Sequence, residues 1–333
     1  MYRHWIAILR KLFFGLGLAL LYASQTVTPT SAAGLLYVSN EKSNDLTILD
    51  AKTLQVIKTV KTCRRPRGIR FNLDHTQFFV ACADDDQIAV YETATLTLQQ
   101  RILGIAGPET FDLHPDGTRL FVSNEEDAAA TEVDLKTRKI LGSVELGEEP
   151  EGVLFSRDGN TVYVASEAAN LVHVINVREM TVTADIVVGT RPRRFALSKD
   201  EKELWVSTEL AGQVDIIDTK TRKLIGDVTF LPIGFRKEEV TPVDLLITKD
   251  GNTAYVALGR ANHVAVVDVH RRKVLKYILV GSRPWGLALN RDESRLYVAN
   301  GLSDDLSEID TTSGKVLKSV PVGRVPYGIL VDD

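Results

Sequence analysis

One short apolar segment recurs seven times along the chain, and its spacing constrains the fold more than any other feature. Each copy places an aromatic residue inside a strand-like run, as in Leu-Tyr-Val-Ala-Asn at 296–300. Successive copies lie 42 residues apart, except for one interval of 50. The aromatic positions are Tyr37, Phe79, Phe121, Tyr163, Trp205, Tyr255 and Tyr297. A fixed period of this length is typical of architectures built from one repeated supersecondary unit.

Within each period, short apolar runs alternate with polar turns. A polar residue, usually Asp, stands 13 residues after each aromatic, and a proline stands 13 residues before the next aromatic. Asp, Asn, Gly and Ser at such positions accept left-handed dihedrals or bond the local backbone, so they separate strands. Four short strands in about 42 residues are typical of one β-propeller blade.

The two ends of the repeat array complement each other. The first unit begins directly at its Leu-Tyr-Val strand, and the chain ends on the strand that this unit lacks, 326–331. We therefore predict an all-β fold, a seven-bladed β-propeller that forms a single domain over 34–333. Its C-terminal strand is expected to join the N-terminal blade and close the ring, which removes exposed sheet edges. An open solenoid would need capping units, and neither end resembles one.

Residues 1–33 differ in kind from the repeats. Basic residues precede an apolar stretch from 12 to 23, and small residues stand at 31–33. This order predicts a signal peptide, since an uncleaved anchor would need about 20 apolar residues. We expect a periplasmic protein with no membrane span after cleavage. The segment holds three Lys/Arg and no Asp/Glu, so its removal moves the net charge from −4 to −7, which argues against nucleic acid as a partner.

Alternating strand direction sorts the loops onto two faces. The proline face carries the loops before each proline and after each aromatic strand, and the turn face carries hairpin turns such as 114–118. The proline-face loops vary more between repeats and carry arginines around Pro66 and Pro192 with acidic residues between them. They form our candidate ligand or partner face. Its residues are Arg65, Arg67, Glu109, Glu151, Arg193, Arg194, Phe235, Arg236, Arg283, Trp285, Arg324 and Tyr327.

Each of these assignments has a plain alternative. The charged loops could simply be solvated, and Trp285 and Tyr327, which directly follow their prolines, could either form a ligand platform or pack against the next blade. The extra eight residues before Pro242 carry Phe235 and Arg236 in one blade only. They either shape the rim of the site or a docking surface, or are a tolerated loop extension.

Cys63 and Cys82 are the only cysteines. Cys63 occupies the repeat position that is glycine in four other units, and Cys82 ends the next aromatic strand, on the same face. A disulfide is possible in an oxidising compartment, and two free buried thiols remain the alternative.

Several catalytic and cofactor motifs are missing from the sequence. It has no Cys-x-x-Cys-His for covalent haem, no His-Glu-x-x-His, no phosphate-binding glycine loop and no Gly-x-Ser-x-Gly elbow. The five histidines after residue 33 suggest no metal site. Nothing in the sequence brings together a nucleophile, a base and an orienting residue. Whether the protein is an enzyme stays open, and the balance of these observations is against catalysis.

The repeated Leu-Tyr-Val-Ala-Asn-Gly, with its following Val/Ile-Asp and Val-Gly-x-x-Pro, resembles the YVTN family of propeller repeats. Further segments resemble the PQQ-dependent catabolism-associated subgroup: RRPRGI at 64–69, PETFDL at 108–113, RPRRFAL at 191–197, ELWVSTE at 203–209, ALGRANHVAVVD at 257–268 and LVGSRPWGLAL at 279–289. This resemblance implies an exported protein that accompanies quinoprotein alcohol oxidation. The resemblance implies a quinoprotein dehydrogenase, cytochrome c or transporter components as partners. It is also the only reason to connect the protein with PQQ as a cofactor. It carries no catalytic residues.

Three hypotheses follow. The leading one is a periplasmic binding or accessory propeller of a PQQ-dependent alcohol oxidation system, acting through the proline face. The alternatives are a lactonase-like hydrolytic propeller that uses charged residues such as Glu109, Glu151 and Arg193 at the channel mouth, and a cell-surface scaffold. Propellers serve all three purposes, so the fold alone does not choose among them.

Overall fold

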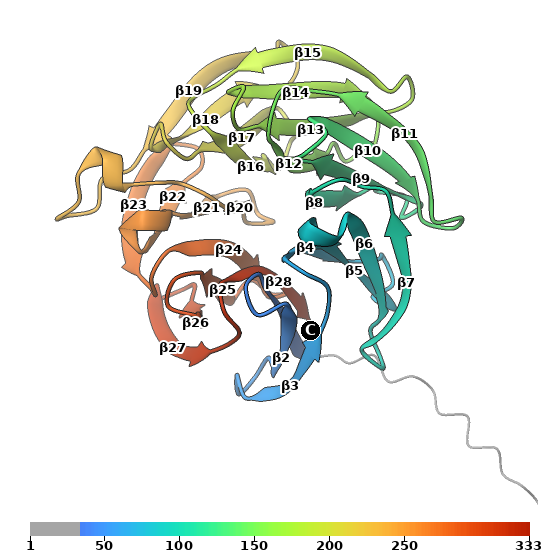
Figure 1. Cartoon of the computed structure of the whole chain (residues 1–333). Coiled ribbons are helices and arrows are strands. Elements are labelled where there is room, and N and C mark those ends of the chain that lie inside the picture. Colours follow the sequence, from blue (N-terminus) through green and yellow to red (C-terminus); the bar gives the residue numbers. More distant parts are fainter. Residues whose placement is uncertain (1–33) are drawn as a thin grey trace, which may run out of the picture. The chain divides into compact units, whose positions relative to one another are not determined.

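The computed structural model describes residues 34–333, which form seven four-stranded antiparallel sheets. Figure 1 shows these sheets as blades around a ring. The predicted signal peptide at 1–33 lies outside the described residues. No helix in the described part of the chain is long and apolar enough to cross a membrane.

Each blade runs from an inner strand at the ring axis to an outer edge strand. In the first three blades the strands, from inner to outer, are β28 (Pro326–Asp332), β1 (Leu35–Asn40), β2 (Asp45–Asp50) and β3 (Val56–Lys61); β4 (Pro66–Phe71), β5 (Gln77–Cys82), β6 (Gln87–Glu92) and β7 (Thr97–Leu103); and β8 (Pro108–Leu113), β9 (Arg119–Asn124), β10 (Ala129–Asp134) and β11 (Lys139–Glu145). 

The other four blades repeat this order. Their strands are β12 (Pro150–Phe155), β13 (Thr161–Ser166), β14 (Leu171–Asn176) and β15 (Thr181–Val187); β16 (Pro192–Leu197), β17 (Glu203–Thr208), β18 (Gln213–Asp218) and β19 (Lys223–Thr229); β20 (Leu245–Ile247), β21 (Thr253–Ala257), β22 (His263–Asp268) and β23 (Lys273–Leu279); and β24 (Pro284–Leu289), β25 (Arg295–Asn300), β26 (Asp305–Asp310) and β27 (Lys315–Pro321).

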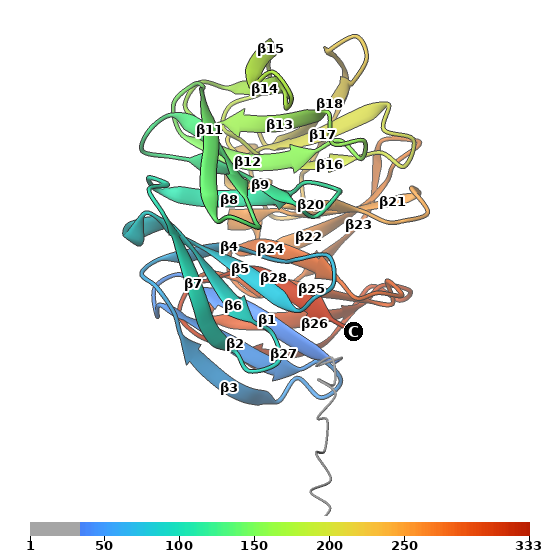
Figure 2. The ribbon, with the colours of Figure 1, turned by 90° about the vertical axis from the view of Figure 1, so that its right-hand side faces the viewer.

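The predicted ring closure is confirmed. Strand β28 pairs antiparallel with β1, with Tyr37 opposite Leu330, so the first blade takes three strands from the N-terminal end of the array and one from its C-terminal end. Strand β28 contacts both β24 and β4 and lies between them in the ring (Figure 1), and Figure 2 shows it from the side. Six of the seven inner strands begin at the recurring proline, which lacks the N–H that a ladder position would need.

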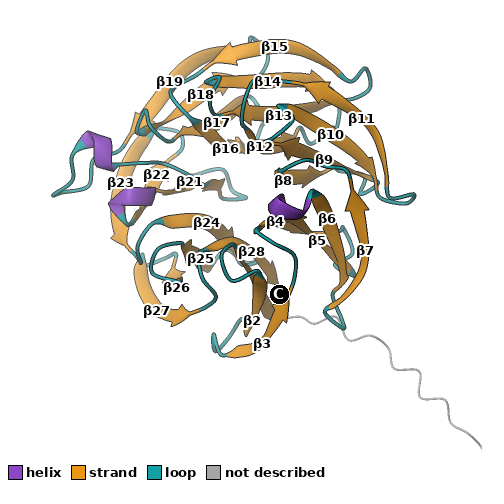
Figure 3. Ribbon diagram, viewed as in Figure 1, coloured by secondary structure: helices purple, strands orange, loops and turns teal. Residues whose placement is uncertain are grey.

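The sixth blade departs from the repeat at its inner strand. There the extra residues form a loop with the 3-10 helix η2 (Lys237–Glu239), and β20 begins at Leu245, after Pro242. Figure 3 shows η2 and the two other short 3-10 helices, η1 (Ala83–Asp85) and η3 (Gly259–Ala261), in loops outside the sheets.

The hydrophobic core lies between neighbouring blades. Seven clusters of buried residues each join strands of adjacent sheets, and all seven repeat aromatics are buried in them. Trp205 is fully buried, and its indole N–H donates to Glu203 at 3.0 Å. Because this packing uses the repeated residues, the residues that differ between blades are left for the two faces and the axis.

Candidate functional site

The position directly after each proline places side chains at the proline-face end of the ring axis. The occupants of this position are Arg67, Glu109, Glu151, Arg193, Val243, Trp285 and Tyr327. All of them except Trp285, which is half-buried, are buried, although four carry ionisable charges. Buried charges are stable only when they are paired and hydrogen-bonded, so their partners define the site.

A recurring set of hydrogen bonds to the backbone holds the loops that carry these partners. The residue before the proline is left-handed in six blades, as in Arg191 (φ 63°) and Arg283 (φ 56°). In five of these six blades its N–H donates to an Asn or Asp side chain of the preceding hairpin: Asn170 accepts from Arg191, and Asn262 from Arg283, both at 2.9 Å. Its carbonyl accepts from the residue after the aromatic strand, as from Glu209 N–H at 2.8 Å. Each arginine is thereby fixed next to whatever follows that strand.

Arg193 is the centre of one half of the site. It contacts three carboxylates, Glu151 at 3.1 Å, Glu209 at 3.2 Å and Glu167. Its side chain is only 3% exposed, and each of the carboxylate side chains is 4% exposed. One guanidinium therefore neutralises three buried carboxylates in part, and further arginines complete the balance.

Arg191 and Arg283 complete that balance from the solvent side. Arg191 contacts Glu167 at 2.7 Å and Glu209 at 3.1 Å, and Arg283 contacts the other oxygen of Glu209 at 3.2 Å. Their side chains are 41% and 20% exposed, in contrast to Arg193. Glu209 is thus held by three arginines, two of which present guanidinium donors to the mouth of the channel.

Trp285 lies between two of these arginines. The guanidinium carbon atoms of Arg193 and Arg283 lie 4.9 and 4.8 Å from its ring centroid. A Cβ on Gly301 would come within 2.3 Å of the Trp285 ring, so only glycine leaves room for the indole there. Of the two roles weighed for Trp285, packing against the neighbouring Tyr327 occurs, with centroids 5.8 Å apart, and the ring also borders the open mouth.

The other half of the site is centred on Arg67. This guanidinium contacts Glu41 at 2.9 Å and Glu109, and it donates to the Tyr327 hydroxyl at 3.1 Å. Arg65 reaches Glu109 at 2.9 Å from the neighbouring loop. The arginines and acidic residues that form separate sectors along the sequence therefore pair across blades at the mouth.

Tyr327 and Glu151 connect the two halves. The Tyr327 hydroxyl donates to Glu151 at 2.7 Å, and the half-buried Arg194 contacts the same carboxylate at 2.9 Å. Behind them, an axial cavity of about 210 Å³ is lined by all seven inner strands, with Arg194, Trp285 and Tyr327 on its wall. We call the whole set of side chains the mouth cluster: Glu41, Arg65, Arg67, Glu109, Glu151, Glu167, Arg191, Arg193, Arg194, Glu209, Arg283, Trp285 and Tyr327.

The carboxyl groups of the mouth cluster have different proton affinities. Burial, and after it the charge of Glu151, raises the pKa of Glu167 to about 8, against the opposing effect of Arg193. Burial also raises the pKa of Glu109 above its ordinary value. At Glu151 burial acts in the same direction, but Arg193, Arg194 and Arg67 outweigh it and hold the pKa below its ordinary value. A buried carboxyl that titrates near neutral pH is suited to proton transfer.

Four residues of the mouth cluster are not among the predicted face residues. One is Arg191, which belongs to the arginines noted around Pro192; the other three are Glu41, Glu167 and Glu209. These three glutamates share one repeat position, four residues after the aromatic, which is glutamate in four of the seven units. This recurrence of glutamate is the sequence signal that could have identified these three residues. Their importance depends on the cross-loop backbone hydrogen bond, which sequence spacing does not reveal.

Three of the predicted face residues do not join the mouth cluster. Phe235 packs against the core cluster of the sixth blade, 5.6 Å from the ring of His263. Arg236 is largely exposed and pairs with Glu239 inside its own loop at 3.2 Å. Arg324 is exposed, and its backbone N–H donates to Ser43. The inserted loop therefore extends the rim and contributes nothing to the buried site.

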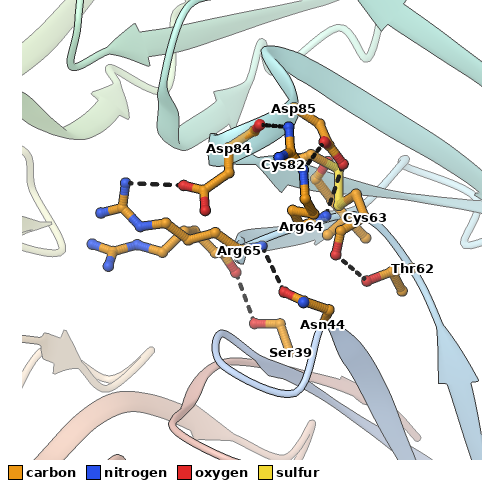
Figure 4. The surroundings of a disulfide bond; sticks show 11 residues. Ser39, Asn44, Thr62, Cys63, Arg64, Arg65, Cys82, Asp84 and Asp85 are labelled. Carbon is orange, nitrogen blue, oxygen red and sulfur yellow. Dashed lines mark hydrogen bonds and ion pairs between the residues drawn. A yellow bond between two sulfur atoms is a disulfide. The ribbon is translucent and has the colours of Figure 1, made fainter.

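The structure joins Cys63 and Cys82 in a disulfide, with Cα atoms 5.6 Å apart. Figure 4 shows this bond beside Arg64 and Arg65, where Arg64 pairs with Asp85 at 2.6 Å. In four of the other six blades the matching pair is a glycine and a polar residue. A Cβ on Gly147, for example, would lie 3.3 Å from Ser166 Cβ. The fold thus already brings these two positions close together, and the disulfide joins them covalently. The bond also anchors the loop that carries Arg65.

Ser166, His173 and Asp185 form a triad-like chain that the sequence analysis did not foresee. Ser166 Oγ lies 2.9 Å from His173 Nε2, and His173 Nδ1 lies 2.6 Å from Asp185. However, Ser166 is fully buried and its hydroxyl donates to the Gly147 carbonyl at 3.0 Å, while Gly147 N–H donates to His173 Nε2 at 3.1 Å. The chain therefore fastens a loop, and it presents no nucleophile. Within residues 34–333, no group of three or more His, Cys, Asp and Glu side chains is arranged to hold a metal ion.

Comparison with known proteins gives one family match. The family model "Lactonase, 7-bladed beta-propeller" matches residues 178–331. The search of curated proteins found no match. The matched part contains Arg191, Arg193, Glu209, Arg283 and Trp285, and Glu167 lies just before it.

Solved structures support the fold. A periplasmic gluconolactonase from Pseudomonas aeruginosa is 20% identical, with a TM-score of 0.75, and the match covers 89% of this chain and 98% of that one. A putative 6-phosphogluconolactonase from Bacteroides fragilis is 15% identical, with a TM-score of 0.74, covering 90% and 98%. Kuenenia stuttgartiensis hydrazine synthase is 19% identical, with a TM-score of 0.71, covering 79% and 88%. Identities this low establish the propeller fold and leave the activity to the site.

These findings correct two expectations from the sequence. The expectation that the protein does not catalyse a reaction was wrong, because the matching family model is that of a hydrolytic enzyme. The resemblance to the PQQ-associated subgroup is not confirmed, and the lactonase alternative fits the matches better than the accessory role does.

Proposed function

We propose that the protein hydrolyses a lactone at the mouth cluster. The observation that carries the proposal is Glu167: a buried carboxyl with a pKa of about 8, held between Arg191 and Arg193 at an open mouth. The family match over 178–331 supports the same reaction class.

A lactone is a cyclic ester, so its hydrolysis requires attack by water on the carbonyl carbon and release of the ring oxygen. We assign the general base to Glu167, because a carboxylate whose conjugate acid has a pKa near 8 removes a proton from water more readily than an ordinary glutamate does. Once protonated, the same group can return that proton to the departing ring oxygen. One side chain then serves both halves of the reaction.

The exposed arginines supply the positive charge that the reaction needs. Attack of water places negative charge on the former carbonyl oxygen, and guanidinium donors fixed in advance stabilise that charge. Arg283 and Arg191 both face the mouth, and Glu209 holds both in place. We assign the oxyanion contact to Arg283, which borders Trp285 as well as Glu209, and we assign to Trp285 the role of an apolar platform for the lactone ring.

The experiment is a hydrolysis assay on a panel of aldonolactones and alkyl lactones, with acid release followed by a pH indicator. We expect turnover by the wild type, loss of at least 100-fold in kcat for Glu167→Gln, and a similar loss for Arg283→Met. Arg324→Met is the matched control, since Arg324 is an exposed arginine of the same face outside the mouth cluster. A panel without turnover, or variants that retain full activity, would refute the proposal.

The location of this activity is a further part of the proposal. The predicted signal peptide and the disulfide both support export to an oxidising compartment such as the periplasm. Fractionation of cells that express the full-length chain tests this, with the protein expected in the periplasmic fraction at a mass lacking 33 residues.

A further inference from the structure

The ring axis also opens on the turn face. A pocket of about 390 Å³ lies at this end, between the inner strands of four consecutive blades, β24, β28, β4 and β8. It shares Arg70 and Ile329 with the axial cavity, so the two spaces adjoin along the axis. Its volume is in the range of small-molecule sites.

The wall of this turn-face pocket is mostly apolar and incompletely covered. Half-buried apolar side chains line it from three of the strands: Leu113, Ala288, Leu289, Ile329, Leu330 and Val331. Apolar side chains that stay partly open in a concave surface gain free energy when an apolar ligand covers them. The wall therefore favours a ligand with a hydrocarbon body.

Arg70 gives the pocket its charge. The corresponding inner-strand position is Leu or Ala in five other blades and Asp112 in the sixth, so the repeat itself does not require an arginine there. Its side chain is 46% exposed and makes one ion pair, with Asp112 at 3.3 Å. A guanidinium has five N–H donors, and no hydrogen bond from this side chain to another described residue occurs, so donors remain for a ligand anion.

Asp112 offsets the charge of Arg70 but contacts only one of its guanidinium nitrogens. Its two oxygens accept backbone N–H groups, from Leu113 and from Phe155 of the next blade, each at 2.9 Å. The carboxylate is therefore fixed by the backbone and orients Arg70 from one side. At the rim, His75 pairs with Asp332 at 2.9 Å and stacks on Phe71 with centroids 4.4 Å apart, which closes that side of the pocket.

We propose that the turn-face pocket binds an amphipathic carboxylate, with the carboxylate on Arg70 and the hydrocarbon body against the inner-strand wall. This site is separate from the mouth cluster, which lies at the proline-face end of the same axis. The proposal does not depend on lactone hydrolysis.

The test is calorimetric titration of the full-length protein with octanoate, alongside 1-octanol and acetate, which carry only the hydrocarbon chain or only the anion. We expect octanoate to bind at least tenfold more tightly than either fragment, with a negative heat-capacity change from apolar burial. Arg70→Met, which keeps the aliphatic length, should weaken octanoate binding ten- to 100-fold and leave 1-octanol unchanged, because a charge-assisted hydrogen bond is lost. Arg271→Met is the control, since Arg271 is a largely exposed turn-face arginine outside the pocket.

Each other outcome overturns the proposal. Failure of octanoate to bind, equal binding of acetate, or equal weakening in Arg70→Met and Arg271→Met would refute the site; thermal unfolding of both variants checks that they are folded. Lactone turnover of Arg70→Met separates the two proposals, because we expect it to match the wild type. A parallel loss of turnover and octanoate binding would show that the pocket belongs to the hydrolytic site and is not a separate one.

Discussion

Replacing Glu167 with glutamine should stabilise the protein at neutral and alkaline pH while it removes the proposed hydrolytic activity. The reason is the raised pKa of this carboxyl, which moves from an ordinary value of 4.5 to about 8 in the folded protein. Between those two pH values, the folded state binds a proton that the unfolded state has released. The free energy of unfolding therefore falls as pH rises through this range, and the loss is complete above pH 8.

The size of the effect follows from the shift. One pKa unit corresponds to about 1.4 kcal/mol, so the loss is about 3 kcal/mol at pH 7 and about 5 kcal/mol above pH 8. The Glu167 side chain is 4% exposed, so solvent screening reduces this little. Glutamine cannot ionise and keeps a similar shape. These values are therefore upper limits for the increase in the free energy of unfolding that Glu167→Gln causes. Raised pKa values elsewhere, such as that of Glu109, act in both proteins and cancel in the comparison.

The assay is urea unfolding of the wild type and Glu167→Gln at pH 5 and pH 8, with lactone turnover measured on the same samples. The stability difference should be below about 1 kcal/mol at pH 5 and should grow to a few kcal/mol at pH 8. In the wild type, kcat/KM should rise about tenfold between pH 7 and pH 9, as the ionised fraction of Glu167 rises. A stability difference that does not change with pH, or a flat activity profile, would refute the reasoning.

The other predictions concern how the site is held. Cys63→Gly/Cys82→Ser, which installs the residue pair of another blade, should lower the free energy of unfolding by about 3 kcal/mol, as measured by urea unfolding; an unchanged value would contradict a role for the bond in stability. Gly301→Ala should displace the Trp285 ring and raise KM for lactones, with a change in tryptophan fluorescence; normal fluorescence and KM would show that the ring tolerates a Cβ 2.3 Å away. Glu209→Gln should destabilise the protein by about 3 kcal/mol at both pH 5 and pH 8, because three arginines lose a charged partner; a gain in stability would contradict the pairing.

The ring could be predicted from the sequence because one period sets strand number, strand order and closure together. The sequence also indicated that charged residues such as Glu109, Glu151 and Arg193 lie together at the channel mouth, which agrees with their ion pairs. The sixth blade was harder to predict, since the inserted residues shift the start of its inner strand from the proline to Leu245. Repeat position predicts placement well wherever the backbone follows the repeat.

The pairing inside the mouth cluster could not be predicted in the same way. Repeat position says that two side chains face the same axis, but the choice of partner depends on loop hydrogen bonds and on side-chain reach between blades. Glu209 shows this: its own N–H bonds the carbonyl of Arg191, and only this contact brings its carboxylate under Arg191 and Arg283. The sequence separation of these residues, up to 74 positions, gives no hint of the contact.

The same reasoning explains why departures from the repeat are informative at both ends of the axis. The repeated residues fill the interfaces between blades, so replacing one of them costs packing energy and changes no function directly. Trp285 on one face and Arg70 on the other occupy positions where most blades carry something else, and both remain partly open to solvent. The packing between repeats requires neither side chain. Trp285 packs on Tyr327 and Arg70 pairs with Asp112, but both keep a surface open for a ligand, and the lactone and octanoate experiments test the two ends independently.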